Sequence, residues 1–99
     1  MKTMKYTVIV QSALGPRAGE LKLTVYEKRV SGNFSLLGAQ NALTGQELQP
    51  DKYLISGMLT AGVGKEPYDG IVTLKGGKLL GGLFTPHGCW DMTGVQIGE

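Results

Sequence analysis

The sequence predicts an all-β protein, an antiparallel eight-stranded meander that closes as a small up-and-down β-barrel. Three observations predict it: an internal repeat of about 25 residues, turn signals at short intervals, and alternation of apolar and polar residues. Eight twisted strands tend to close into a barrel or to fold over as a β-sandwich, because both arrangements hide the strand edges. The β-sandwich is the alternative, since it requires the same alternation.

The repeat appears as columns of similar residues. The members of each column follow one another at one constant step along the chain: Gly32, Gly57 and Gly82; Phe34, Leu59 and Phe84; Ser35, Thr60 and Thr85. A unit of this length accommodates two strands of about 8 residues with two turns, and it is too short for a βαβ crossover of roughly 30 residues. The repeat therefore predicts two-strand units joined in antiparallel fashion.

Turn signals divide the chain of 99 residues, which we expect to form a single domain over 1–99. The four prolines all fall in the predicted breaks, where no hydrogen bond of a strand ladder is lost. The expected strands are 4–12, 19–27, 29–37, 40–46, 52–60, 68–75, 78–85 and 89–97. Residues 39–48 are the least strand-like, and a short helix is the alternative there.

Period-two alternation assigns the faces of the strands. In 29–37 the apolar set Val30, Gly32, Phe34 and Leu36 is expected to point inward. Carrying this phase forward by the length of the repeat predicts that Leu80, Gly82 and Phe84 also point inward. The inward glycines are explained by the tight kinks that a small barrel needs. In the last strand Trp90 and Met92 alternate in one phase, and Val95 and Ile97 in the other. We therefore predict a bulge at Gly94, which would let both pairs point inward.

The same phase places an apolar stripe on the outside of three adjacent strands. Its members are Leu54, Met58, Ile71, Leu79 and Leu83. Five such side chains make a patch of a few hundred Å², a size typical of a binding surface. A homodimer is the expected partner, because twofold contacts dominate among oligomers. Burial of the stripe within one chain, as in a sandwich, is the alternative.

The pattern Gly-x-Phe/Leu-Ser/Thr, with Thr-Gly closing the following strand, resembles small bacterial calycin-like barrels of lipocalin or avidin type. The resemblance covers about residues 5–97 and implies a small hydrophobic ligand inside the barrel. Its expected lining is Tyr6, Phe34, Phe84 and Trp90. The Gly-x-Trp signature of lipocalins is absent, because Trp90 follows Cys89, and no biotin-site pattern can be placed.

The segment Thr85 to Asp91 contains the single His, the single Cys and the single Trp. On a strand, His87, Cys89 and Asp91 would share a face, so a thiol nucleophile with a neighbouring base is a remote alternative function. Three ligands fall short of the four that structural zinc requires. We therefore expect no catalytic residue, no metal and no cofactor.

Charge and hydropathy exclude other classes. The formal net charge of +2 comes from scattered Lys and Arg residues, whereas nucleic-acid binding needs a clustered basic stripe. No apolar segment approaches the roughly 18 residues of a transmembrane helix, so no membrane partner is expected. One cysteine and no export signal predict the cytoplasm. The leading function is a non-enzymatic binding or interaction module that acts as a homodimer.

Overall fold

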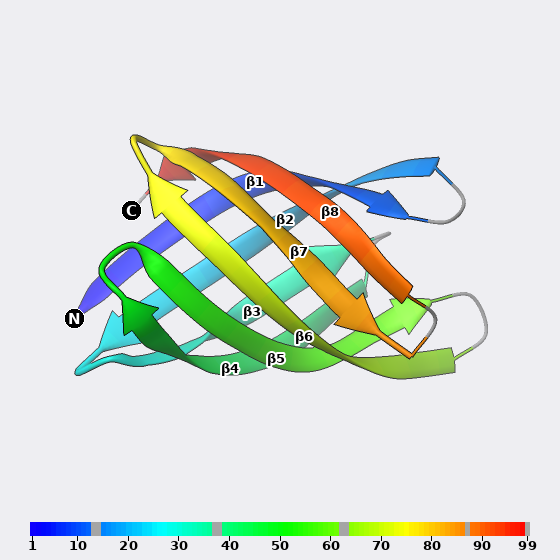
Figure 1. Cartoon of the computed structure of the whole chain (residues 1–99), viewed down its shortest axis with the longest axis horizontal. Coiled ribbons are helices and arrows are strands. Elements are labelled where there is room, and N and C mark those ends of the chain that lie inside the picture. The colour runs from blue at the N-terminus through cyan, green and yellow to red at the C-terminus, as the bar shows by residue number, and fades with distance from the viewer. Residues whose placement is uncertain (13–14, 37–38, 62–63, 87, 99) are drawn as a thin grey trace.

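Eight antiparallel strands form a closed barrel in the computed structural model of the chain (Figure 1). The structure describes residues 1–12, 15–36, 39–61, 64–86 and 88–98. The strands are β1 (Lys2–Ser12), β2 (Gly15–Tyr26), β3 (Arg29–Leu36), β4 (Ala39–Gln49), β5 (Lys52–Ala61), β6 (Gly64–Lys75), β7 (Lys78–Thr85) and β8 (Gly88–Gly98). Each strand pairs with the next in sequence, and β1 pairs with β8. The meander barrel is confirmed, and the segment 39–48 lies in strand β4 rather than in a helix.

Tight turns join the strands at the end of the barrel where the N-terminus lies (Figure 1). Glu27 and Lys28 have φ values of 50° and 69°, and Gly76 and Gly77 have 63° and 75°. Positive φ at both central residues defines the type I′ turn, whose twist matches that of the flanking strands.

Among the described residues, no helix is long and apolar enough to cross a membrane.

Alternating side chains fill the inside of the barrel with a single apolar core. Its members include Tyr6, Val8, Leu21, Leu23, Phe34, Ile55, Leu59, Tyr68, Val72, Leu79, Leu83 and Met92. The rings of Phe34 and Tyr68 stack with their centroids 5.8 Å apart. Within the part of the chain that the structure describes, the buried core contains no charged residue. The interior of an eight-stranded barrel is just wide enough for side chains to fill it, and here they do so.

Each strand from β2 to β8 carries a glycine within its inner row, away from the strand ends. These glycines, one per strand, are Gly19, Gly32, Gly45, Gly57, Gly70, Gly81 and Gly94. Each lies opposite a larger residue of a neighbouring strand, as Gly32 lies opposite Leu23. A Cβ atom on Gly32 would overlap the carbonyl oxygen of Lys22, so the strands approach too closely for any side chain there. The inward direction expected for Gly32 and Gly57 is confirmed, and a tight bend of the barrel wall is the role we expect of such glycines.

The predicted phase is wrong in β7. Leu79 and Leu83 are buried, with 1% and 0% exposure, whereas Leu80 is 62% and Phe84 46% exposed. The cause is the two-residue turn at Gly76 and Gly77, which pairs Lys75 with Lys78 and puts both on the outside. Paired residues share a face of the sheet, so the residue after Lys78 points inward. Equivalent positions of the repeat therefore point inward in both β3 and β5, but point outward in β7, where Gly82 lies in the outer row.

The predicted bulge at Gly94 is also absent. Gly94 pairs in regular register with Val8 of β1 and with Leu79 of β7. Val95 and Ile97 consequently stay on the outside, with 56% and 51% exposure. The register shifts instead near the end of β8. Tyr6 pairs with Gln96 and Lys5 pairs with Gly98, so β8 has one extra residue between these two pairs.

Candidate functional site

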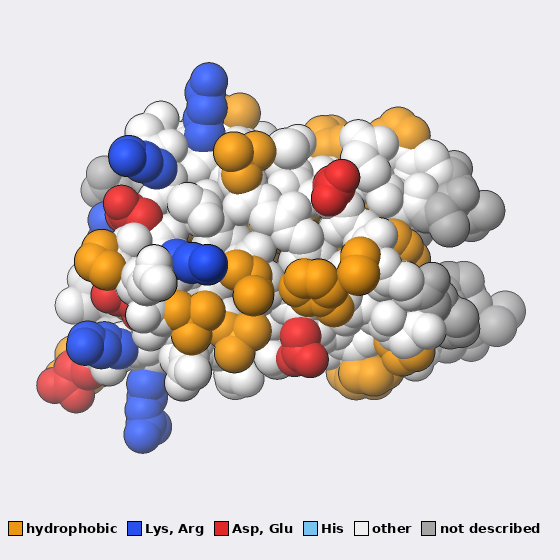
Figure 2. All heavy atoms as spheres, in the orientation of Figure 1, with side chains coloured by type: hydrophobic (Ala, Val, Ile, Leu, Met, Phe, Trp, Pro, Cys, Tyr) orange, Lys and Arg blue, Asp and Glu red, His pale blue; other side chains and the backbone are white. Residues whose placement is uncertain are grey.

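An apolar patch covers the outside of strands β5, β6 and β7. We call it the β5–β7 patch, and its members are Leu54, Met58, Pro67, Ile71, Leu80 and Phe84. The pairing Leu54–Ile71 and Met58–Pro67 joins β5 to β6, and Ile71 lies opposite Gly82 of β7. Figure 2 shows hydrophobic side chains gathered over these strands. Because Gly82 carries no side chain, the middle of the patch is low and accessible.

The sequence predicted the place of this patch and part of its membership. Leu54, Met58 and Ile71 lie on the outside as expected, whereas Leu79 and Leu83 belong to the core. Leu80 and Phe84, which the repeat predicts to lie inside, replace them. The signal that could have found them is the pair Gly76-Gly77, because a two-residue turn reverses the phase of the strand that follows.

The outer rows of β2, β3 and β4 are more polar, although Tyr26 and Leu48 are exposed on β2 and β4. On β2, β3 and β4 these rows carry Glu20, Lys22, Thr24, Ser31, Asn33, Ser35, Gln40, Thr44 and Gln46. Polar side chains of this kind keep a sheet face in water. The β5–β7 patch lies on the side of the barrel away from these polar rows, and exposed apolar residues continue from it onto β8 and β1, at Val95, Ile97 and Ile9. A contiguous apolar surface is the kind that marks an interaction site.

Charges around the β5–β7 patch are unevenly placed along the barrel axis, and Lys65 lies beyond Asp69 on the outer row of β6. Lys75 and Lys78 face each other across the β6–β7 turn. Asp69 lies on β6 and Asp91 lies on β8 opposite Gly82, both farther from that turn. The hydroxyl of Ser56 donates a hydrogen bond of 2.7 Å to Oδ1 of Asp69, which holds this carboxylate on the outer face. Figure 2 shows Lys and Arg side chains toward the end that carries the N-terminus.

Two of the four residues expected to line an interior ligand site, Tyr6 and Phe34, are fully inside the barrel. Trp90 is partly buried and packs against the core. Phe84 points outward, so its predicted place in the lining is wrong. The remaining interior side chains pack together in one core cluster. This packing does not favour a hydrophobic ligand inside the barrel, which stays a prediction.

A smaller hollow opens at the end of the barrel that carries the N-terminus, and we call it the barrel mouth. Its volume is about 260 Å³. The apolar floor is formed by Met4 and Leu74, and the polar wall includes Lys2, Tyr6, Asp51, Tyr53, Lys75 and Gln96. The amide of Leu74 donates a hydrogen bond of 2.8 Å to the carbonyl of Asp51, which fixes the β4–β5 turn over the edge of the barrel mouth. Sequence analysis missed this grouping, because its members come from several strands and two turns.

The two tyrosines of the barrel mouth are inside the barrel, with 2% and 8% exposure for Tyr6 and Tyr53. Burial raises the pKa of the Tyr6 hydroxyl, with smaller contributions from Tyr53 and Asp51. Burial likewise raises the pKa of Tyr53, followed by the carboxylates of Glu47 and Asp51. Both hydroxyls therefore stay protonated at neutral pH and are able to donate as well as accept hydrogen bonds.

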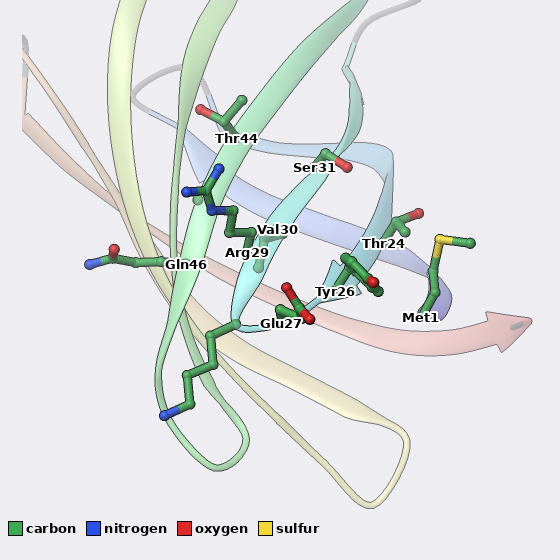
Figure 3. A pocket seen from close by; sticks show the side chains of 11 residues that line it. Met1, Thr24, Tyr26, Glu27, Arg29, Val30, Ser31, Thr44 and Gln46 are labelled. Atoms are coloured by element: carbon green, nitrogen blue, oxygen red, sulfur yellow. The ribbon is translucent and has the colours of Figure 1, made fainter.

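A wide hollow of about 1120 Å³ lies on the polar side of the molecule. Its lining comes from the outward rows of β2, β3 and β4 near the turn that contains Glu27 (Figure 3). The side chains of Thr24, Arg29, Thr44 and Gln46 spread in different directions instead of converging on one point (Figure 3). A ligand site needs a few convergent polar groups, and this concavity lacks that arrangement.

The segment with the rare residues shows no clustered chemistry in the described part of the chain. Cys89 is a free, exposed thiol at the start of β8, opposite Phe84. His87 lies outside the described residues, and its predicted place beside Cys89 stays a prediction. Residues 1–12, 15–36, 39–61, 64–86 and 88–98 contain no group of three or more His, Cys, Asp and Glu side chains that could hold a metal ion.

A comparison of the chain with protein-family models, curated proteins and solved structures finds no match. The chain is an eight-stranded antiparallel barrel with a filled interior, an apolar outer patch and a polar mouth, and its function is inferred from these features.

Proposed function

We propose that this protein is a non-enzymatic interaction module that pairs with a second copy of itself through the β5–β7 patch. The observation that supports the proposal best is the apolar surface that neighbouring residues of β5, β6 and β7 form on this side, with Leu80 and Phe84 at 62% and 46% exposure. Removing such side chains from water stabilises an assembly by about 25 cal/mol per Å² of apolar surface. In a single chain these side chains remain exposed to water, because they lie outside the core of the barrel.

The size of the available face suits a dimer. The molecule measures 36 × 21 × 20 Å, so its long side offers an area close to the roughly 800 Å² per partner of a standard stable interface. The β5–β7 patch would form the buried centre, and the charged residues at its borders would form the polar rim.

Charge complementarity favours a second copy over an unrelated partner. Asp69 and Lys75 both lie on β6, separated by about 20 Å along the strand. A twofold axis near Leu80 and Ile71 would place the lysine end of one copy against the aspartates of the other. Opposite potentials meeting across an interface give specificity and orientation. The same surface is therefore complementary to itself when one copy is reversed.

Light scattering on size-separated protein tests the proposal. We expect wild type to have the mass of two chains at tens of micromolar, and Leu80→Lys to have the mass of one chain while keeping its far-UV circular dichroism. Ser31→Lys, on the polar side, is the matched control and should remain dimeric. A wild-type mass of one chain at these concentrations would contradict the proposal, as would a dimer that Leu80→Lys leaves intact.

Charge reversal tests the orientation. We expect the double variant Lys75→Glu, Lys78→Glu to dissociate more readily on dilution than wild type. Adding Asp69→Lys and Asp91→Lys restores the complementarity, so the fourfold variant should regain the dimer mass. Equal dissociation in the double and fourfold variants would rule out the reversed arrangement.

A further inference from the structure

We propose that the barrel mouth is a binding site for a small zwitterion of the size of a free amino acid. The proposal concerns a different surface from the β5–β7 patch and does not depend on the dimer. It rests on the geometry of the barrel mouth: a hollow of about 260 Å³ with an apolar floor, lined by charges of both signs and by two buried tyrosines.

The two tyrosines are the first feature of the hollow on which the proposal rests. Tyr53 is more than nine-tenths buried, yet no other residue in the described part of the chain forms a hydrogen bond with its hydroxyl. The hydroxyl of Tyr6 has only the sulfur of Met4 as an acceptor among the described residues, at 3.9 Å. A thioether sulfur is a weak acceptor. Both tyrosines line the barrel mouth, and their hydroxyls are available to a ligand there, because protein groups take up little of their hydrogen-bonding capacity.

The charged residues of the lining are the second feature on which the proposal rests. Asp51 lies on one side of the barrel mouth, close enough to both tyrosines to affect their titration. Lys2 and Lys75 line the same hollow. Within residues 1–12, 15–36, 39–61, 64–86 and 88–98, neither lysine forms an ion pair with Asp51. Residues of both charge signs therefore border one small hollow without neutralising each other in an ion pair.

A zwitterion satisfies all of these groups at once. Its ammonium group would bind the carboxylate of Asp51, and its carboxylate would bind Lys2. The hydroxyls of Tyr6 and Tyr53 can donate to the ligand carboxylate or accept from its ammonium group, since they stay protonated. A simple cation would be repelled by the lysine side chains of the lining, and a simple anion would be repelled by Asp51. The apolar floor of Met4 and Leu74 leaves room for a short aliphatic side chain.

Titration with free amino acids, followed by ¹⁵N–¹H spectra of the whole chain, tests this inference. We expect millimolar amounts of at least one of a panel of aliphatic and hydroxylated L-amino acids to shift the amide signals of Gly76, Gly77 and Gln96. The same amino acid as its N-acetyl amide, which has neither charge, should cause no shift there. Asp51→Asn should weaken the binding about tenfold, because it removes a charge-assisted hydrogen bond.

Two controls separate this site from the dimer and from loss of folding. Asp69→Asn changes a carboxylate on the outer face and should leave the titration unchanged. Leu80→Lys should bind the amino acid as wild type does, whatever its mass in solution. Absence of shifts with the whole panel would overturn the proposal. Equal shifts with the blocked amide, or shifts confined to residues away from the barrel mouth, would overturn it as well.

Discussion

Truncation of Leu83 is the most direct test of the face assignment in β7. Leu83 is completely buried and lies opposite Gly70 on one side and Trp90 on the other. A Cβ atom on Gly70 would lie 3.0 Å from Cδ2 of Leu83, which shows how closely this side chain fills the space above the glycine. Leu83→Ala therefore leaves a cavity that Gly70 has no side chain to fill.

The expected loss follows from the atoms removed. Three carbons at about 0.8 kcal/mol each give roughly 2.4 kcal/mol, and the residual cavity brings the total to about 3 kcal/mol. For a domain of this size the melting temperature should fall by more than about 10 °C. The matched control is Leu80→Ala, which removes the same atoms from an exposed position and should cost less than about 0.5 kcal/mol in the monomer.

Urea denaturation followed by far-UV circular dichroism measures both variants. The loss caused by Leu83→Ala should not depend on protein concentration, because the side chain lies inside one barrel. Any loss caused by Leu80→Ala should shrink on dilution, since it reflects the assembly. Equal, concentration-independent losses in the two variants would refute the inward phase of Leu79, Gly81 and Leu83.

Two further predictions concern barrel closure and alkaline pH. Gly32→Ala should destabilise the fold by more than about 2 kcal/mol, because its Cβ would overlap a backbone oxygen. Gly82→Ala should be tolerated, because the atom nearest to its Cβ would be 3.6 Å away. Equal shifts of the melting temperature in the two variants would contradict this difference in environment. Burial raises the pKa of Tyr68 above its ordinary value of 10.0, so above that pH the unfolded chain loses a proton that the folded chain keeps. The free energy of unfolding should therefore fall between about pH 9 and about pH 11, less steeply in Tyr68→Phe, and a pH-independent value over that range would be inconsistent with the burial.

Local rules predicted the strands and the order in which they pair. Glycine pairs and Pro50 mark turns, and short connections between strands favour antiparallel neighbours, so the meander follows from signals that act over a few residues. The expectation that every proline falls in a break is wrong for Pro16 and Pro67, which lie in β2 and β6 and pair with Gln11 and Met58. The same rules correctly placed Val30, Phe34 and Ile55 inside, because their alternation is read within one strand. Neither the closure of β1 onto β8 nor the choice of barrel over sandwich is a local property.

The error in β7 arose because a phase was carried from one strand to another, whereas the Gly94 bulge was wrongly expected because Val95 and Ile97 are apolar although exposed. The repeat predicts Leu79 and Leu83 on the outside, while the actual phase of β7 is set by the turn at Gly76 and Gly77. The barrel mouth was not foreseen for a related reason. Tyr6, Asp51 and Gln96 are far apart in the chain and meet only because the barrel closes. Sequence by itself determined which residues alternate, and tertiary structure decided which face each row occupies and which distant polar groups share a space.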